Sequence, residues 1–186
     1  GLVETNPITG SDGSLARFGT GVLIHKIASA GLLPAYNFSG KKLDYTDVDP
    51  FSGETVKEKY LLKRTACFAC PTACGRWVAV GGWEGKGPEF QSVVMLGPNV
   101  GSGFFSYEKA IVPLSRLCDR LGLDTITTGA ILAYLRELEK ITSVEEAIDA
   151  IIEMAQGKSE LSFGLAAVAK KFKGAKAPMV KGLPMP

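Results

Sequence analysis

The sequence lacks the features that define several protein classes. It has one histidine and four cysteines, and its 21 Lys and Arg residues exceed its 19 Asp and Glu residues by a net charge of +2. So small a charge gives no reason to expect nucleic acid or an anionic membrane as a partner. No apolar run approaches the ~18 residues of a membrane-spanning helix, and no segment resembles a secretory signal. With 46% apolar and 22% charged residues among 186, the composition is that of a folded globular chain.

Hydrophobic periodicity predicts a mainly α fold, a multihelical domain of about seven helices. Residues 77–80, followed by Gly81 and Gly82, are the only strand-like run and predict one short hairpin or strand pair near 77–87. A long loop is expected over 34–53, and a turn over 97–103. The predicted helical segments are 14–30, 54–64, 88–96, 107–121, 125–140, 143–157 and 162–171.

The ends of the chain differ from its centre in composition. We expect an irregular lead-in over residues 1–13, a helical domain over 14–173, and a Pro/Gly-rich linker over 174–186. Because the sequence starts at Gly1 without a Met and has Pro-rich ends, we expect a piece of a longer chain.

Three of the four cysteines lie together in Cys67-Phe-Ala-Cys70-Pro-Thr-Ala-Cys74. Offsets of three and seven fall on one helical face, so one interpretation is small buried core residues. The other is a thiolate metal site, because iron–sulfur clusters take soft thiolates from a short, sharply turning segment. Pro71 and Gly75 supply such turning and argue against a continuous helix. We therefore favour the metal site over core packing, and over disulfides, for which a secretory signal is lacking.

Zinc is the competing metal for these cysteines. Structural zinc sites usually take their ligands as two Cys/His pairs, whereas here three cysteines cluster and Cys118 stands apart. The lone histidine, His25, lies far upstream in an amphipathic stretch and is expected to be an ordinary, partly buried residue. Iron–sulfur is therefore favoured.

A second segment, Asp119-Arg-Leu-Gly-Leu-Asp-Thr125, stands between two predicted helices. Structurally, Gly122 can close the first helix in a left-handed conformation, with Leu123 as its hydrophobic companion, and Asp124 can cap the next helix. Functionally, two carboxylates beside a glycine turn can accept hydrogen bonds from a heterocycle rich in N–H donors, such as the 2-amino-pyrimidinone edge of a pterin. On these residues alone both interpretations stay open.

Together, the cysteine turn and the Asp-x-x-Gly-Leu-Asp-Thr segment resemble the tungsten-containing aldehyde ferredoxin oxidoreductase family. The resemblance covers nearly the whole chain and implies the middle domain of a three-domain subunit. Further segments match in family order: Arg17-Phe-Gly-Thr-Gly, Asn37-Phe, Cys74-Gly-Arg76, Gly87-Pro-Glu-Phe90, Leu96-Gly, and Cys118 together with the residues through Ile126.

The resemblance implies a set of cofactor ligands. Cys67, Cys70 and Cys74 match three of the four thiolates of a [4Fe–4S] cluster, and the fourth lies in a missing C-terminal domain. Cys118 matches no ligand and is expected to be a buried core cysteine. One of two molybdopterins that chelate tungsten (or molybdenum) in the full-length protein is implied to bind at Asp119, Gly122, Leu123, Asp124 and Thr125.

The implied activity is the two-electron oxidation of a small aldehyde to a carboxylic acid at tungsten, with electrons passing singly through the cluster to ferredoxin. The other implied partners are the missing N- and C-terminal domains, and the implied location is the cytoplasm. We expect the isolated chain to be inactive and to hold a labile cluster or none. We also expect it to self-associate, with a homo-oligomer as one outcome, through apolar patches that the missing domains would cover.

Two positions depart from the family pattern. The family carries a second carboxylate two residues after the Glu of Gly-Pro-Glu, and here that residue is Gln91. Proton transfer would then pass to Glu89, water or substrate, although Glu89 is also interpreted as a first-turn residue stabilised by the helix dipole. Pro113 and Arg116 stand where some members carry the Glu and His of an iron site between subunits, so that metal is expected to be absent.

Two alternatives to the leading prediction remain. Gln91 motivates the first, a homologue that kept the cofactor-binding residues but has altered chemistry. The second is a self-contained helical domain with a structural four-cysteine zinc site that includes Cys118.

Overall fold

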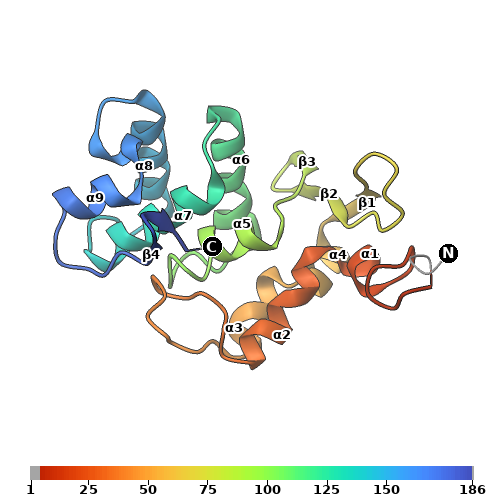
Figure 1. Ribbon diagram of the computed structural model, residues 1–186. Helices are drawn as coiled ribbons and strands as arrows, with labels where there is room; N and C mark the ends of the chain where they lie inside the picture. The colour runs from red at the N-terminus through yellow and green to blue at the C-terminus, as the bar shows by residue number, and fades with distance from the viewer. Residues whose placement is uncertain (1–4, 186) are drawn as a thin grey trace. The chain divides into compact units, whose positions relative to one another are not determined.

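The computed structural model describes residues 5–185, and the chain forms two compact units (Figure 1). The first unit comprises Gly1–Leu33 with Leu43–Phe90, and the second comprises Pro34–Lys42 with Gln91–Pro186. Residues 1–4 of the predicted lead-in and Pro186 of the predicted linker lie outside the described residues. None of the helices in the described part of the chain has the length and apolar character that a membrane span needs. The predicted mainly α fold with a small sheet is confirmed.

Short helices build most of the first unit. The helix predicted over 14–30 is divided at Gly19, because its φ of +69 departs from helical geometry. A Cβ at Gly19 would also lie 2.6 Å from Arg76 Nε. The loop predicted over 34–53 is wrong over 45–51, where Asp44 and Asp47 form a reciprocal capping box that starts a helix. The helical elements are α1 (Ser14–Phe18), η1 (Thr20–Val22), α2 (Leu23–Ser29), α3 (Tyr45–Val48), η2 (Asp49–Phe51) and α4 (Gly53–Lys59).

A three-stranded antiparallel sheet completes this unit in the order β1 (Leu61–Thr65), β2 (Gly75–Val80), β3 (Trp83–Lys86). The predicted hairpin near 77–87 is confirmed, and both residues of its Gly81-Gly82 turn have positive φ. The helix predicted over 54–64 is wrong after residue 59. Residues 61–65 pair with β2 instead, so tertiary pairing decides the conformation of a segment whose sequence continues the charged pattern of α4.

Longer helices build the second unit, and their ends follow the sequence signals. Pro113 begins the regular part of its helix after a π-helical turn, and Ser143 and the left-handed Gly157 bound α8 as predicted. The elements are α5 (Phe90–Leu96), η3 (Tyr107–Ile111), α6 (Val112–Leu121), α7 (Thr125–Glu137), α8 (Val144–Gln156), η4 (Glu160–Phe163), α9 (Leu165–Lys171), β4 (Met179–Val180) and β5 (Leu183–Pro184).

Three expectations for this unit need correction. The predicted helix 125–140 ends at Glu137, because Glu139 adopts a left-handed φ of +54. The last helix begins at Leu165 rather than Ser162, after the 3-10 turn η4. The predicted linker contains a hairpin, in which Met179–Val180 pairs with Leu183–Pro184.

The core of the second unit lies where α5, α6, α7 and α8 meet. α6 packs along α8 (Figure 1), and buried Leu114, Ile131 and Ile151 belong to one apolar cluster. α7 lies close to α5 at Gly129, where a Cβ would lie 2.6 Å from the Met95 carbonyl oxygen. The absence of a side chain at this position therefore sets the spacing of the two helices.

Candidate functional site

The cysteine loop, residues 66–74, connects β1 to β2 and is closed by the Thr65–Gly75 pair. Gly75 does not supply the turning predicted for it. It permits close strand pairing, because a Cβ there would lie 2.3 Å from Thr65 Oγ1. The turns come instead from Ala69 and Ala73, which have φ of +55 and +48 and directly precede two of the cysteines. Left-handed residues of this kind turn backbone N–H groups inward, as in anion-binding nests and iron–sulfur sites.

The three thiols share one cavity of about 290 Å³ in the first unit. Cys67 is exposed, and Cys70 and Cys74 are half-buried, so the interpretation as core residues on a helical face is wrong. The cavity is also lined by Thr65, Ala66, Gly75, Trp77, Lys86 and Glu89. The structure therefore brings together the three predicted metal ligands and Glu89, one of the two predicted catalytic residues.

The thiols differ in acidity because their surroundings differ. Hydrogen bonds from the backbone N–H groups of Thr72 and then Ala73 lower the pKa of Cys70. Burial raises the pKa of Cys74, and the nearby Glu89 carboxylate and the other two cysteines raise it further. Thiolates this close repel one another, and a bound cationic metal centre relieves that repulsion.

These observations fit an iron–sulfur cluster through donor chemistry. Three soft sulfur donors share a cavity, and backbone N–H groups point at a sulfur, as at the thiolate ligands of such clusters. Among residues 5–185, no three His, Cys, Asp or Glu side chains are arranged around a single metal ion. A four-iron cluster takes each thiolate on a different iron, so its ligands do not converge on one point.

Glu89 joins this cavity to η1. Thr20 Oγ1 donates to Glu89 Oε2 at 2.6 Å, and the Phe90 N–H donates to Thr20 Oγ1 at 3.0 Å. Glu89 immediately precedes α5 and also lines the cavity, so its position fits both interpretations of this residue. Gln91 lies in the first turn of α5 and is exposed.

Arg76 is a buried residue for which the sequence indicates no role. Its side chain is 6% exposed, and Nη2 donates to the carbonyl oxygens of Leu15 and Ala16 at 2.8 and 2.7 Å, at the end of α1. Nε and Nη1 are buried and meet no acceptor among residues 5–185. Burial, and then Arg64, lower the pKa of Arg76, whereas the charges of Cys74 and Glu89 act in the opposite direction. The only sequence signal for this residue was its place directly after Cys74-Gly.

The aspartate segment belongs to the second unit and forms the turn between α6 and α7. Gly122 is left-handed, the Leu123 N–H donates to the Cys118 carbonyl oxygen at 2.9 Å, and Asp124 Oδ2 accepts from the Thr127 N–H at 2.6 Å. The predicted structural roles of Gly122, Leu123 and Asp124 are therefore confirmed.

The two carboxylates of this turn are exposed, whereas its threonine hydroxyl already has a partner. Asp119 and Asp124 are exposed, and Thr125 Oγ1 lies 2.8 Å from Ser92 Oγ of α5. The cysteines and the aspartates belong to different units, so their joint use in one redox site stays a prediction.

Two residues outside the site behave as predicted. Cys118 is 0% exposed within the core of the second unit, and burial raises its pKa to about 11. A thiol buried in this way is not placed to complete a zinc site. His25 is partly buried, stacks on Tyr45 with ring centroids 4.1 Å apart, and has Nε2 3.5 Å from Asp49 Oδ1.

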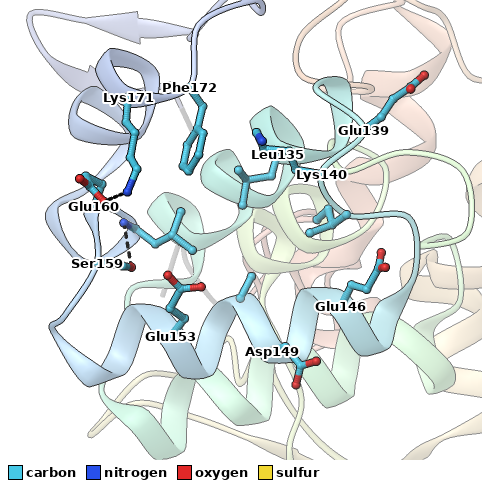
Figure 2. Close-up of a pocket in the computed structure, with 13 residues that line it drawn as sticks. Leu135, Glu139, Lys140, Glu146, Asp149, Glu153, Ser159, Glu160, Lys171 and Phe172 are labelled. Atoms are coloured by element: carbon cyan, nitrogen blue, oxygen red, sulfur yellow. Dashed lines mark hydrogen bonds and ion pairs between the residues drawn. The ribbon is translucent and has the colours of Figure 1, made fainter.

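A larger cavity of about 570 Å³ in the second unit lies outside the predicted site (Figure 2). Apolar Leu135 and Phe172 line it together with five carboxylates and two lysines, and Lys171 pairs with Glu160. No residue named as a site residue from the sequence lines this cavity.

A loop with three closely spaced cysteines on a hairpin is typical of proteins that bind a metal cofactor. A sequence profile described as aldehyde ferredoxin oxidoreductase, domains 2 & 3, matches residues 2–186. The chain therefore belongs to the aldehyde ferredoxin oxidoreductase family, as the resemblance predicted.

Curated relatives agree with this assignment. The tungsten-containing aldehyde ferredoxin oxidoreductase of Pyrococcus furiosus is 40% identical over 143 residues, which cover 73% of this chain and 22% of the relative. The protein of the same name from Thermococcus kodakarensis is 37% identical over 139 residues, again 73% and 22%. The aliphatic sulfonate oxidoreductase, WOR-like subunit, of Pyrococcus furiosus is 34% identical over 101 residues, 51% of this chain and 16% of the relative. The chain thus spans only 22% of the length of the first two relatives.

Proposed function

We propose that this chain is part of a cytoplasmic tungstopterin iron–sulfur oxidoreductase that oxidises aldehydes to carboxylic acids with ferredoxin as acceptor. The observation that carries the proposal is the cavity shared by Cys67, Cys70 and Cys74 in a member of this family. Two relatives named as tungsten-containing aldehyde ferredoxin oxidoreductases support the metal, the substrate class and the acceptor.

The cofactors supply the electron chemistry: aldehyde and water yield carboxylic acid, two protons and two electrons, which leave singly through the cluster. In this proposal the three thiolates of the loop hold the cluster, and the N–H groups of Thr72 and Ala73 stabilise charge on the Cys70 sulfur. The turn from Asp119 to Thr125 binds the pterin, with the Asp119 and Asp124 carboxylates accepting its N–H groups and Gly122 and Leu123 letting the heterocycle approach the backbone.

Proton transfer in the proposed site has to differ from the family pattern, because Gln91 stands where the family carries a carboxylate. Gln91 can donate and accept hydrogen bonds but cannot take up a proton near neutral pH. Glu89 supplies the carboxylate that lines the cysteine cavity, and the Thr20 hydroxyl fixes one of its oxygens. We propose that Gln91 orients substrate or water and that Glu89 holds the proton.

Gln91 also favours a second candidate, a family member with altered chemistry. One relative is named as an aliphatic sulfonate oxidoreductase, WOR-like subunit, so not every relative of this chain carries a name that specifies an aldehyde substrate. The structural zinc alternative has less support, because it requires the buried Cys118.

The test uses the full-length protein, purified without oxygen. Iron and tungsten are measured, and reduction of ferredoxin is followed with a set of aldehydes and, in parallel, aliphatic sulfonates. Aldehyde-dependent reduction supports the first candidate, and sulfonate-dependent reduction alone supports the second. Stoichiometric zinc in place of iron contradicts both.

A further inference from the structure

We propose that Arg76 sets the reduction potential of the iron–sulfur cluster, with its buried guanidinium acting on the cluster and on its Cys74 ligand. The inference rests on the proposed function, since it requires that the cysteine loop holds a cluster. It concerns a residue that neither lines the cysteine cavity nor matches any predicted ligand.

The first observation is that the buried guanidinium of Arg76 has only some of its N–H groups hydrogen-bonded. Arg76 is 6% exposed, and the acceptors that Nη2 reaches are neutral carbonyl oxygens of α1. Nε and Nη1 have no acceptor among the described residues. A charge removed from water is costly unless an opposite charge compensates it. The nearby Cys74 and Glu89 supply negative charge, but the free N–H groups of Nε and Nη1 can still donate to a further anionic acceptor.

The second observation is position. Arg76 follows Cys74 by two residues, and the Arg76 side chain folds back beside the Cys74 backbone. The point where a Cβ of Gly19 would lie is 2.6 Å from Arg76 Nε and 3.1 Å from the Cys74 carbonyl oxygen. Gly19, with its left-handed φ, leaves the space that the guanidinium occupies. A cluster bound through Cys74 would thus place its negative charge beside Arg76, on which the charges of Cys74 and Glu89 already act.

The positive charge of Arg76 affects the reduction potential of a nearby cluster. A cluster held by thiolates is anionic, and reduction adds one more negative charge. A fixed cation in a poorly solvated position stabilises the reduced form more than the oxidised form, which raises the potential. Hydrogen bonds from Nε–H or Nη1–H to a cluster sulfur act in the same direction.

A purely structural role is the alternative, because Arg76 also holds the end of α1 through Leu15 and Ala16. That role predicts lower stability when Arg76 is replaced but no change in the potential of whatever cluster remains. The two roles therefore separate on a redox measurement.

The experiment is a redox titration of the full-length protein, prepared without oxygen and monitored by EPR of the reduced cluster. In Arg76→Gln we expect the reduced-to-oxidised ratio at a fixed potential to fall at least tenfold, which is 59 mV for one electron. Arg76→Lys keeps the charge, and we expect a smaller fall. The matched control is Arg64→Gln, because Arg64 is exposed and pairs with Arg76 across β1 and β2. We expect the control to stay within twofold of wild type.

A measurement on the unaltered protein covers the case in which Arg76→Gln does not fold. Labelling arginine with ¹⁵N should give pulsed-EPR coupling between guanidinium nitrogen and the reduced cluster, and Arg76→Lys should abolish it. An unchanged ratio in Arg76→Gln, or no coupling in the labelled wild type, overturns the role of Arg76 and leaves the proposed function intact. A wild-type protein that holds no cluster overturns both.

Discussion

At the scale of single residues, the cysteines divide into two kinds by their surroundings. Cys70 lies in a loop with N–H groups at its sulfur, whereas Cys118 is packed in the core of the second unit. We expect Cys70→Ser to abolish the brown chromophore after anaerobic reconstitution, because it removes a soft ligand. Cys118→Ala should retain the chromophore and the iron content. Loss of metal in Cys118→Ala alone would favour the four-cysteine zinc alternative.

Burial of Cys118 also predicts how stability depends on alkaline pH. Burial raises the pKa of Cys118 from 9.0 to about 11, so the folded state disfavours the thiolate that the unfolded chain forms. The contribution is present below pH 9 and is lost as pH rises toward 11. Between about pH 8 and about pH 10.5 it should lower the free energy of unfolding by about 2 kcal/mol.

Urea unfolding of the chain at the two pH values measures this loss. Cys118→Ala supplies the control, because other groups also titrate in this range while the variant lacks the thiol. An equal pH dependence in wild type and Cys118→Ala would refute the assignment.

Asp124 has a structural role and a proposed binding role, which substitutions separate. Asp124→Ala removes the cap on the Thr127 N–H and should lower the free energy of unfolding of the chain by about 1 kcal/mol. Asp124→Asn keeps a capping oxygen and should leave stability nearly unchanged. If the carboxylate binds the pterin, Asp124→Asn in the full-length protein should still reduce the tungsten content. Asp119→Asn, which removes the other carboxylate of the turn, should do the same.

At the scale of elements, the contact between α5 and α7 depends on Gly129. An alanine usually stabilises a helix interior by about 1 kcal/mol relative to glycine. Here its Cβ would meet the Met95 backbone at 2.6 Å, and we expect Gly129→Ala to destabilise the chain by about 1–3 kcal/mol. Thr127→Ala in the same helix is the control for helix propensity. Urea midpoints compare the variants, and a stabilised Gly129→Ala would show that the two helices can separate at no cost.

Elements with strong local signals could be predicted from the sequence, and those made by distant contacts could not. Ser143 and Gly157 bound α8, and Gly81-Gly82 joins β2 to β3, because each signal acts within a few residues. β1 was missed because its Lys and Arg continue the pattern of α4 and only pairing with β2 makes it a strand. α3 was missed because the prolines and glycines around it obscured the capping box that begins at Asp44.

At the scale of the whole molecule, the candidate ligands could be predicted from the sequence, but the residues that hold the site in place could not. Cysteine spacing identified the loop that lines one cavity, and family order identified the turn from Asp119 to Thr125. The hydrogen bond between Thr20 and Glu89 and the burial of Arg76 against α1 join segments some sixty or more residues apart. No local pattern encodes such contacts, so they required the structure.

The strand pairing that closes the cysteine loop has a consequence for how the protein responds to oxygen. The Thr65–Gly75 pair and the rungs beyond it are backbone contacts that involve no metal. Chelation of iron should therefore bleach the protein while its circular dichroism spectrum stays constant, and iron, sulfide and a thiol reductant should restore the colour. Oxygen damage is thus repairable until a thiol passes beyond the sulfenic acid stage, at which point the protein must be synthesised anew.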